Sequence, residues 1–144
     1  MATYTVDASV FLNAFNSHEP NHVESREFLA RLQEEELPII APALLLPELA
    51  ATVSRGRGDA DLARKFADTV SRLPHLMLIP LDLTLARQAV DVAADRQLRG
   101  SDAVYAAVAL RFGTTLVSLD REQLRRMRGI VKACGPADAL RELG

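Results

Sequence analysis

The sequence is poor in residue types that define whole classes of protein. It has 144 residues, of which one is cysteine and none is tryptophan. A single cysteine, Cys134, has no partner for an internal disulfide or for a cysteine-based zinc site. The sequence therefore excludes both kinds of cross-link, and Cys134 is expected to be a small buried hydrophobe.

Long hydrophobic runs and a strongly basic balance are also missing. No apolar run approaches the roughly 18 residues that a bilayer-spanning helix needs. The N-terminus starts a strand at once, without a basic start or an apolar leader. We therefore expect a soluble, cytoplasmic protein with no membrane contact. The formal net charge of −2 does not indicate a nucleic-acid binder, although clustering of cations matters more than their sum.

Short apolar runs alternate with helical patterns along the chain. We expect strands at 3–6, 38–41, 76–80, 114–119 and 130–133, and helices at about 10–15, 21–36, 43–53, 59–73, 82–97, 101–112 and 121–127, with a last helical turn from 136. Continuously apolar strands separated by helices indicate a parallel sheet covered on both faces. The sequence thus predicts one α/β domain over residues 1–144, a three-layer α/β/α sandwich with about five strands.

Two helix starts carry polar side chains suited to capping. Asn21 with Glu24 has the capping-box pattern, and Ser101 is expected to cap the very apolar helix that follows it. Tyr105, in that apolar helix, is expected to be a core residue.

Acidic residues follow two expected strands and interrupt two apolar helices. Asp7 ends the first strand and Asp120 ends the fourth. Glu48 and Asp102 lie near the starts of helices that are otherwise apolar. Each acid has an ordinary structural explanation: a helix cap for Asp7 and Asp120, a favourable helix dipole for Asp102, and a narrow solvent stripe for Glu48. Taken singly, capping is the simpler interpretation of Asp7.

The four acids are more informative together. In a parallel sheet, the C-terminal ends of the strands and the N-termini of the following helices lie at one edge, where ligands bind. All four acids belong to that edge, so we expect their carboxylates to share a cleft.

Four carboxylates in one cleft repel one another, and some would have to be protonated. A divalent cation removes this conflict. Hard oxygen ligands without converging histidine or cysteine favour Mg²⁺ or Mn²⁺ over zinc. Such an ion holds a phosphate oxygen and lowers the pKa of a bound water aimed at phosphorus. The acids therefore predict metal-dependent phosphodiester hydrolysis.

With these residues in place, the sequence resembles that of PIN-domain nucleases, and the resemblance covers nearly the whole chain. Any one of the four family motifs is weak, but the ordered set of four is specific. Within the family, the chain is most similar to the small VapC-like toxins of type II toxin–antitoxin pairs. The matching motifs are Val6-Asp7-Ala8-Ser9-Val10, Pro47-Glu48-Leu49, Gly100-Ser101-Asp102-Ala103-Val104-Tyr105-Ala106-Ala107 with Ala109, and Leu116-Val117-Ser118-Leu119-Asp120.

The resemblance implies a fold, an activity and partners. It implies a PIN-like parallel sheet with the first strand central, and metal-dependent endoribonuclease activity on an RNA substrate. It also implies a homodimer that is inhibited by a small antitoxin protein. Ser9 and Ser118 would orient the acids. One departure is Leu124, which stands where such proteins often carry an aromatic residue. The catalytic and metal-binding acids would be Asp7, Glu48, Asp102 and Asp120.

Two further surfaces, one basic and one apolar, can each be interpreted in two ways. A basic cluster beside Asp120 is either a solvated helix face or a track for the RNA backbone. Phe11, Leu12 and Phe15, with the apolar side of the next helix, are either plain core or a groove for a partner segment. The basic cluster comprises Arg121, Arg125, Arg126, Arg128 and Lys132.

Our leading hypothesis is an Mg²⁺- or Mn²⁺-dependent ribonuclease that acts as a toxin. Three alternatives stay open. One is a PIN-like nuclease with a non-toxin role, in RNA processing or DNA cleavage. Another is a phospho-acceptor signalling domain, for which Asp7 lacks an acidic neighbour and Lys132 is poorly placed. The last is an inactive binding module, against which the intact set of acids argues.

Overall fold

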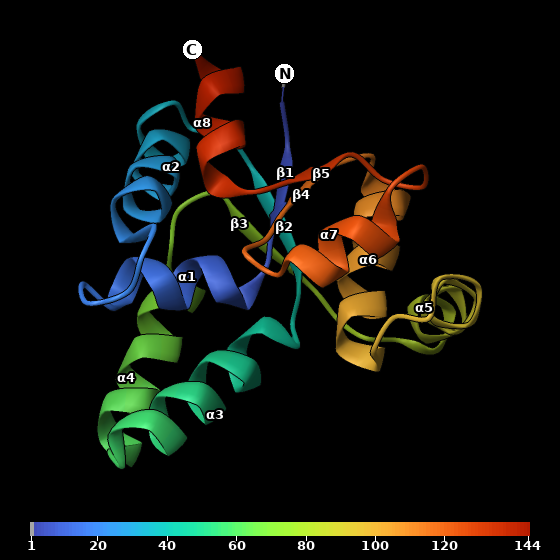
Figure 1. Cartoon of the computed structure of the whole chain (residues 1–144). Coiled ribbons are helices and arrows are strands. Elements are labelled where there is room, and N and C mark those ends of the chain that lie inside the picture. Colours follow the sequence, from blue (N-terminus) through green and yellow to red (C-terminus); the bar gives the residue numbers. More distant parts are fainter. Residues whose placement is uncertain (1) are drawn as a thin grey trace.

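A parallel sheet of five short strands forms the centre of the molecule, whose computed structural model describes residues 2–144 (Figure 1). The strand order is β3-β2-β1-β4-β5, and every neighbouring pair is parallel. The predictions of about five parallel strands and a central first strand are confirmed. The strands are β1 (Tyr4–Val6), β2 (Ile39–Pro42), β3 (Leu76–Ile79), β4 (Thr115–Val117) and β5 (Ala133–Cys134).

The order of the strands places a topological switch point at β1. From β1 the chain goes to β2 and β3 on one side of the sheet, and later to β4 and β5 on the other. In open α/β sheets, ligands bind in the crevice outside the carboxyl ends of the strands at such a point. Asp7 follows β1 directly and therefore stands at the switch point.

Helices cover both faces of the sheet, which confirms the predicted three layers. In Figure 1, α1, α2 and α8 lie on one side and α5 and α6 on the other, while the α3–α4 hairpin projects from the C-terminal edge. No helix within residues 2–144 combines the length and apolar character that crossing a membrane requires. The helices are α1 (Ala8–Phe15), α2 (His22–Glu34), α3 (Leu45–Arg57), α4 (Ala60–Ser71), α5 (Leu83–Arg96), α6 (Gly100–Phe112), α7 (Arg121–Met127) and α8 (Pro136–Leu143).

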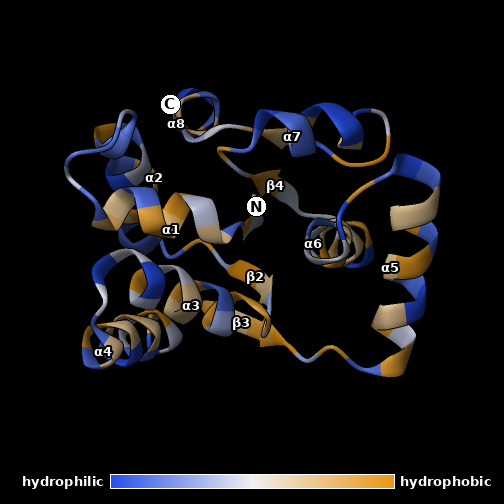
Figure 2. Ribbon diagram, turned by 60° about the horizontal axis from the view of Figure 1, so that its bottom comes forward, coloured by the Kyte–Doolittle hydropathy of each residue, from blue (hydrophilic) through white to orange (hydrophobic). Residues whose placement is uncertain are grey.

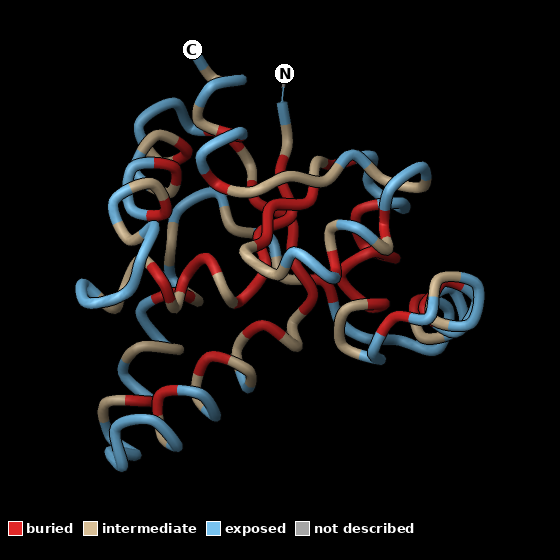
Figure 3. Tube along the Cα trace, viewed as in Figure 1, coloured by how far each residue is buried: buried red, intermediate tan, exposed pale blue. Residues whose placement is uncertain are grey.

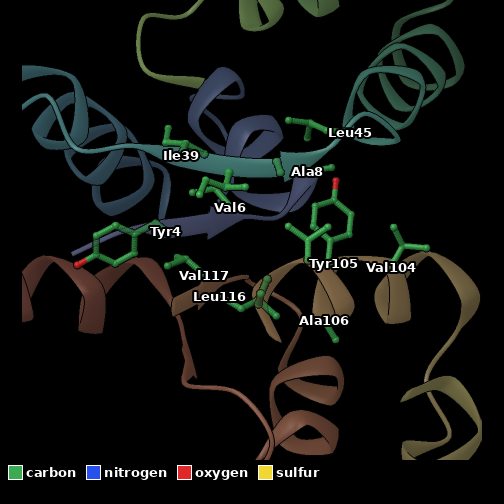
Figure 4. Packing of buried hydrophobic residues seen from close by; sticks show 14 of the residues in the cluster. Tyr4, Val6, Ala8, Ile39, Leu45, Val104, Tyr105, Ala106, Leu116 and Val117 are labelled. Atoms are coloured by element: carbon green, nitrogen blue, oxygen red, sulfur yellow. The ribbon is translucent and has the colours of Figure 1, made fainter. Parts of the chain in front are cut away.

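The core lies around β1, β2, β4 and helix α6. The hydrophobic strands run between the helical layers (Figure 2), and buried residues concentrate along them (Figure 3). Helix α6 is buried from Ala103 to Ala109 and contacts these three strands. Its alanines bring the helix close to the sheet, so that Tyr105 reaches into the core beside Ala8 and Leu45 (Figure 4).

Two strands and one cysteine differ from expectation. The strand β3 is at the edge of the sheet, so Met77 is 55% exposed and the strand is only partly buried. The last strand is limited to Ala133–Cys134, because the chain is still turning at residues 129–131. Cys134 itself is half-buried rather than fully buried.

Two predicted caps are wrong. Asn21 precedes α2 in a left-handed conformation, with φ of 67°, and its side chain makes no capping hydrogen bond. Ser101 lies inside α6, which starts at Gly100 after Arg99.

Proline is tolerated in α3 because Pro47 stands in its first turn, where amides have no partner within the helix.

Candidate active site

Asp7 is held at the end of β1 by two serine hydroxyls. Its Oδ2 accepts hydrogen bonds from Ser9 Oγ at 2.7 Å and Ser118 Oγ at 3.0 Å. Asp7 precedes α1, but its side chain makes no capping hydrogen bond there. The capping explanation therefore does not account for this buried carboxyl. Burial raises the pKa of Asp7 above its ordinary value, and the two serine hydrogen bonds oppose that rise.

The same serines join Asp7 to the chain after β4. The amide of Leu119 donates to Ser9 Oγ at 3.1 Å, and the amide of Asp120 donates to Ser118 Oγ at 3.0 Å. The amide of Asp7 donates in turn to the carbonyl of Val117 at 3.0 Å. The ends of β1 and β4 are thus fixed to each other, and with them the backbone positions of Asp7 and Asp120.

Glu48 reaches the same edge from the first turn of α3. The hydroxyl of Tyr105, on α6, donates to Glu48 Oε1 at 2.7 Å. The ring of Tyr105 lies in the core, as expected, beside Ala8 and Leu45 (Figure 4). Burial raises the pKa of Glu48, and the charges of Asp7 and Asp102 raise it further, whereas the tyrosine hydrogen bond lowers it.

Asp102 and Asp120 are bridged by Arg99. The guanidinium donates from Nε to Asp102 Oδ2 at 3.1 Å and from Nη2 to Asp120 Oδ2 at 2.9 Å. Burial raises the pKa of Asp102, Arg99 opposes this, and the charges of Asp7 and Asp120 add to the rise. Asp120 is also a helix cap, because its Oδ1 accepts from the amides that open α7. The capping explanation is right for this acid, and one oxygen remains available to Arg99.

The four acids therefore come from four segments to one edge of the sheet. The charge of Asp7 raises the pKa of both Glu48 and Asp102, the charge of Asp102 also raises that of Glu48, and Arg99 connects Asp102 with Asp120. Within residues 2–144, no three histidine, cysteine or acidic side chains are grouped tightly enough to form a ready metal site. The four carboxylates thus lie along one edge of the sheet, and Arg99 pairs with two of them.

Most of the predicted basic cluster is engaged with neighbouring groups. Arg125 and Arg126 form ion pairs with Glu122 on α7, and Arg126 also donates to the backbone carbonyl of Gln97. Lys132 pairs with Glu142. Arg121 and Arg128 are exposed. Ion pairing weakens the case for a continuous track for RNA without removing these cations from the surface beside Asp120.

Sequence reasoning missed Arg99 and the polar role of Tyr105. Both lie three residues from Asp102, at the spacing that brings side chains together on one helix face. That spacing was a usable signal. The bond from Tyr105 to Glu48 had no such signal, because it joins residues 57 positions apart.

A parallel sheet with four carboxylates at the C-terminal edge of its strands defines an α/β protein with an acidic edge at its switch point. The chain belongs to the PIN domain family, whose model matches residues 4–130. Among curated proteins, no sequence matches this chain.

Solved structures with the same fold cover nearly the whole chain. PAE2754 from Pyrobaculum aerophilum is 25% identical, with a TM-score of 0.68 over 99% of this chain and 96% of that one. VapC20 from Mycobacterium tuberculosis, described as a sarcin–ricin loop cleaving toxin, is 19% identical, with a TM-score of 0.70 over 91% and 98%. VapBC2 from Rickettsia felis, bound to a promoter DNA fragment, is 16% identical, with a TM-score of 0.71 over 92% and 98%.

Proposed function

We propose that this protein is an Mg²⁺- or Mn²⁺-dependent endoribonuclease, and the toxin of a type II toxin–antitoxin pair. The main support is the acidic edge, along which Asp7, Glu48, Asp102 and Asp120 lie outside the switch point of the sheet. Membership of the PIN domain family agrees with this chemistry. One similar structure is of a toxin that cleaves the sarcin–ricin loop, which favours RNA as the substrate.

The donor set fits a hard divalent cation. All four side chains offer carboxylate oxygens, the ligands that Mg²⁺ and Mn²⁺ prefer. The raised pKa values of Asp7, Glu48 and Asp102 reflect burial and, for Glu48 and Asp102, mutual repulsion as well, which a cation would relieve. When bound, the ion supplies a positive charge for a phosphate oxygen and lowers the pKa of a water molecule.

The chain's own residues would position these ligands. Ser9 and Ser118 fix one oxygen of Asp7, which leaves Oδ1 for other partners. Tyr105 fixes one oxygen of Glu48 in the same way. Arg99 holds Asp102 and Asp120, and its exposed guanidinium is suited to an RNA phosphate.

The decisive experiment compares Asp7→Asn with Asp91→Asn on RNA cleavage in Mn²⁺. Asn keeps the shape of the Asp7 side chain and accepts hydrogen bonds from the two serines, so the fold should persist. Cleavage should be abolished, because one anionic oxygen ligand is lost. Asp91 is an exposed acid on α5, away from the site, and its variant should cleave like the unmodified protein.

Thermal unfolding provides a second measurement that does not depend on turnover. Mn²⁺ should raise the melting temperature of the unmodified protein and of Asp91→Asn, because an ion that binds only the folded state stabilises it. It should raise that of Asp7→Asn much less. Equal RNA cleavage by Asp7→Asn and the unmodified protein would falsify the assignment.

A small antitoxin is the proposed protein partner. An apolar groove of about 260 Å³ between α1, α2 and α4 is suited to a partner segment. The ring centroids of Phe15 and Phe66 lie 4.5 Å apart in the wall of this groove. Phe11 and Leu29 also line it. Expression of the chain alone should arrest growth, and co-expression of a small DNA-binding protein encoded beside it should relieve the arrest. If the chain expressed alone leaves growth unchanged, the toxin role is wrong even if RNA is cleaved.

A further inference from the structure

A second cavity lies directly beside the acidic edge, between the start of α6 and helix α7. Its volume is about 410 Å³, within the range of small-molecule sites. Asp102 and Asp120 belong to its wall, so any molecule in it lies next to the proposed metal ligands. The rest of the wall includes Leu98, Arg99, Gln123 and Arg126.

Gln123 is the unusual residue of this wall. It is only 2% exposed, yet neither its side-chain oxygen nor its side-chain nitrogen has a hydrogen-bond partner in the part of the chain that the structure describes. Buried amides are normally satisfied, because leaving the donor and the acceptor unpaired costs free energy. Because Gln123 also lines the cavity, turning its amide toward the cavity would let a ligand supply the missing hydrogen bonds.

The other wall residues limit what that ligand is. Three acidic residues, Asp102, Asp120 and Glu122, line the cavity and disfavour an additional phosphate in the cavity itself. Leu98 offers an apolar surface, and Arg126 is held by the carbonyl of Gln97, which keeps a planar guanidinium at the wall. Unstacked RNA bases are typically held between such planar or apolar groups and hydrogen-bonded along their edges.

We propose that this cavity binds a nucleobase of the RNA strand and that the amide of Gln123 reads its edge. A glutamine amide presents a donor beside an acceptor, the arrangement that pairs with N6 and N7 of adenine. Adenine is thus the best match. The proposal rests on the proposed function, because a base in this cavity places its phosphate at Asp102 and Asp120. Gln123 is then a specificity-determining residue.

The test uses uncharged nucleosides and the full-length protein without metal, so it needs no cleavage. Adenosine should shift the side-chain amide signals of Gln123 in ¹⁵N–¹H spectra as it is titrated. Purine riboside lacks the exocyclic amino group and should bind at least about fivefold more weakly. The loss of a good bidentate hydrogen-bonded pair weakens binding by about that factor or more.

Gln123→Leu should bind adenosine and purine riboside equally weakly. The leucine replaces an unpaired buried amide with an apolar group of similar size, which is neutral or favourable for folding. Gln33→Leu is the matched control, because the side-chain nitrogen of Gln33 is also buried without a partner but belongs to α2, away from the cavity. It should bind adenosine like the unmodified protein.

The outcomes separate the two proposals. If the Gln123 amide signals do not move, or if adenosine and purine riboside bind equally to the unmodified protein, the base-binding proposal is overturned, even when RNA is cleaved in Mn²⁺. If adenosine binds as expected but no RNA is cleaved, the proposed function fails while the nucleobase site stands.

Discussion

The hydrogen bond from Tyr105 to Glu48 connects the core to the acidic edge. Tyr105 has no exposed surface, and its ring is fixed by packing between α6 and the sheet. A rigid ring holds its hydroxyl in one place, so the 2.7 Å bond also fixes Glu48. The bond lowers the pKa of a carboxyl that burial and two neighbouring acids raise. The buried tyrosine thereby favours the ionised form of Glu48 against the burial and the neighbouring charges that oppose it.

We predict that Tyr105→Phe shifts the acid limb of the cleavage profile to higher pH. Glu48 must be ionised to hold a cation, so activity rises with pH as its carboxyl loses a proton. Removing the hydroxyl removes the interaction that lowers this pKa, which moves the rise upward in pH. The variant should also lose about 1–2 kcal/mol of stability with the hydrogen bond. Activity against pH and thermal unfolding are the measurements.

Tyr4→Phe is the matched control for this experiment. Tyr4 is the other tyrosine of the chain, equally buried, and its ring packs edge-on against Phe28 at 5.3 Å. Removing the Tyr4 hydroxyl should leave the acid limb of the cleavage profile unchanged. A shift of the same size in both variants would mean that Glu48 does not set the acid limb.

At the scale of elements, helix α7 depends on the acid that precedes it. Asp120 Oδ1 accepts from the amides of Glu122 and Gln123 at 3.0 and 3.2 Å, which satisfies two donors of a helix only seven residues long. The same carboxyl contacts Arg99 through Oδ2. The cap and the proposed metal ligand are therefore two functions of one side chain, and substitutions can separate them.

We predict different outcomes for Asp120→Asn and Asp120→Ala. Asparagine caps helices about as well as aspartate, so Asp120→Asn should keep its stability while cleavage falls with the lost charge. Asp120→Ala loses the cap as well and should be less stable by about 1 kcal/mol. Cleavage rates and denaturant unfolding measure the two effects. If both variants cleave normally, Asp120 is a cap and nothing more.

Hydrophobic patterns along the sequence were sufficient to predict the helices and strands but not how deeply each one is buried. Strands such as Ile39–Pro42 are buried on both faces, so a continuous apolar run predicted them and the parallel sheet. The same run at Leu76–Ile79 predicted burial wrongly, because only the strand order shows that β3 is an edge. Asn21 has the residue type of a cap, but its left-handed backbone turns the side chain away from that role.

The acidic edge was predictable from where the strands end, but the polar groups that contact its carboxylates were not. Asp7 and Asp120 follow strands, and parallel strands end at one edge whatever the details of packing. The bond between Tyr105 and Glu48 and the unpaired amide of Gln123 depend on how α6, α3 and α7 meet in three dimensions. No spacing along the chain encodes those contacts.

At the scale of the molecule, large apolar side chains gather on and before α5. Leu81, Leu83 and Val90 are 49%, 65% and 64% exposed. Leu81 and Val90 also line an apolar groove of about 410 Å³ between α5 and α6. Soluble monomers rarely leave such surfaces uncovered, and the resemblance to VapC-like toxins implies a homodimer. We propose that a second copy of the chain covers this face.

We predict that Val90→Lys converts a dimer into a monomer. Val90 is exposed in the single chain, so lysine there should not disturb the fold, but a charge buried between two copies without a partner is strongly unfavourable. Light scattering after size exclusion should give the mass of two chains for the unmodified protein and of one chain for the variant. Val23→Lys, at a 59% exposed position on α2, should remain a dimer. If dissociation follows from Val23→Lys but not from Val90→Lys, the interface lies on the α2 side of the sheet, and the apolar face of α5 needs another occupant.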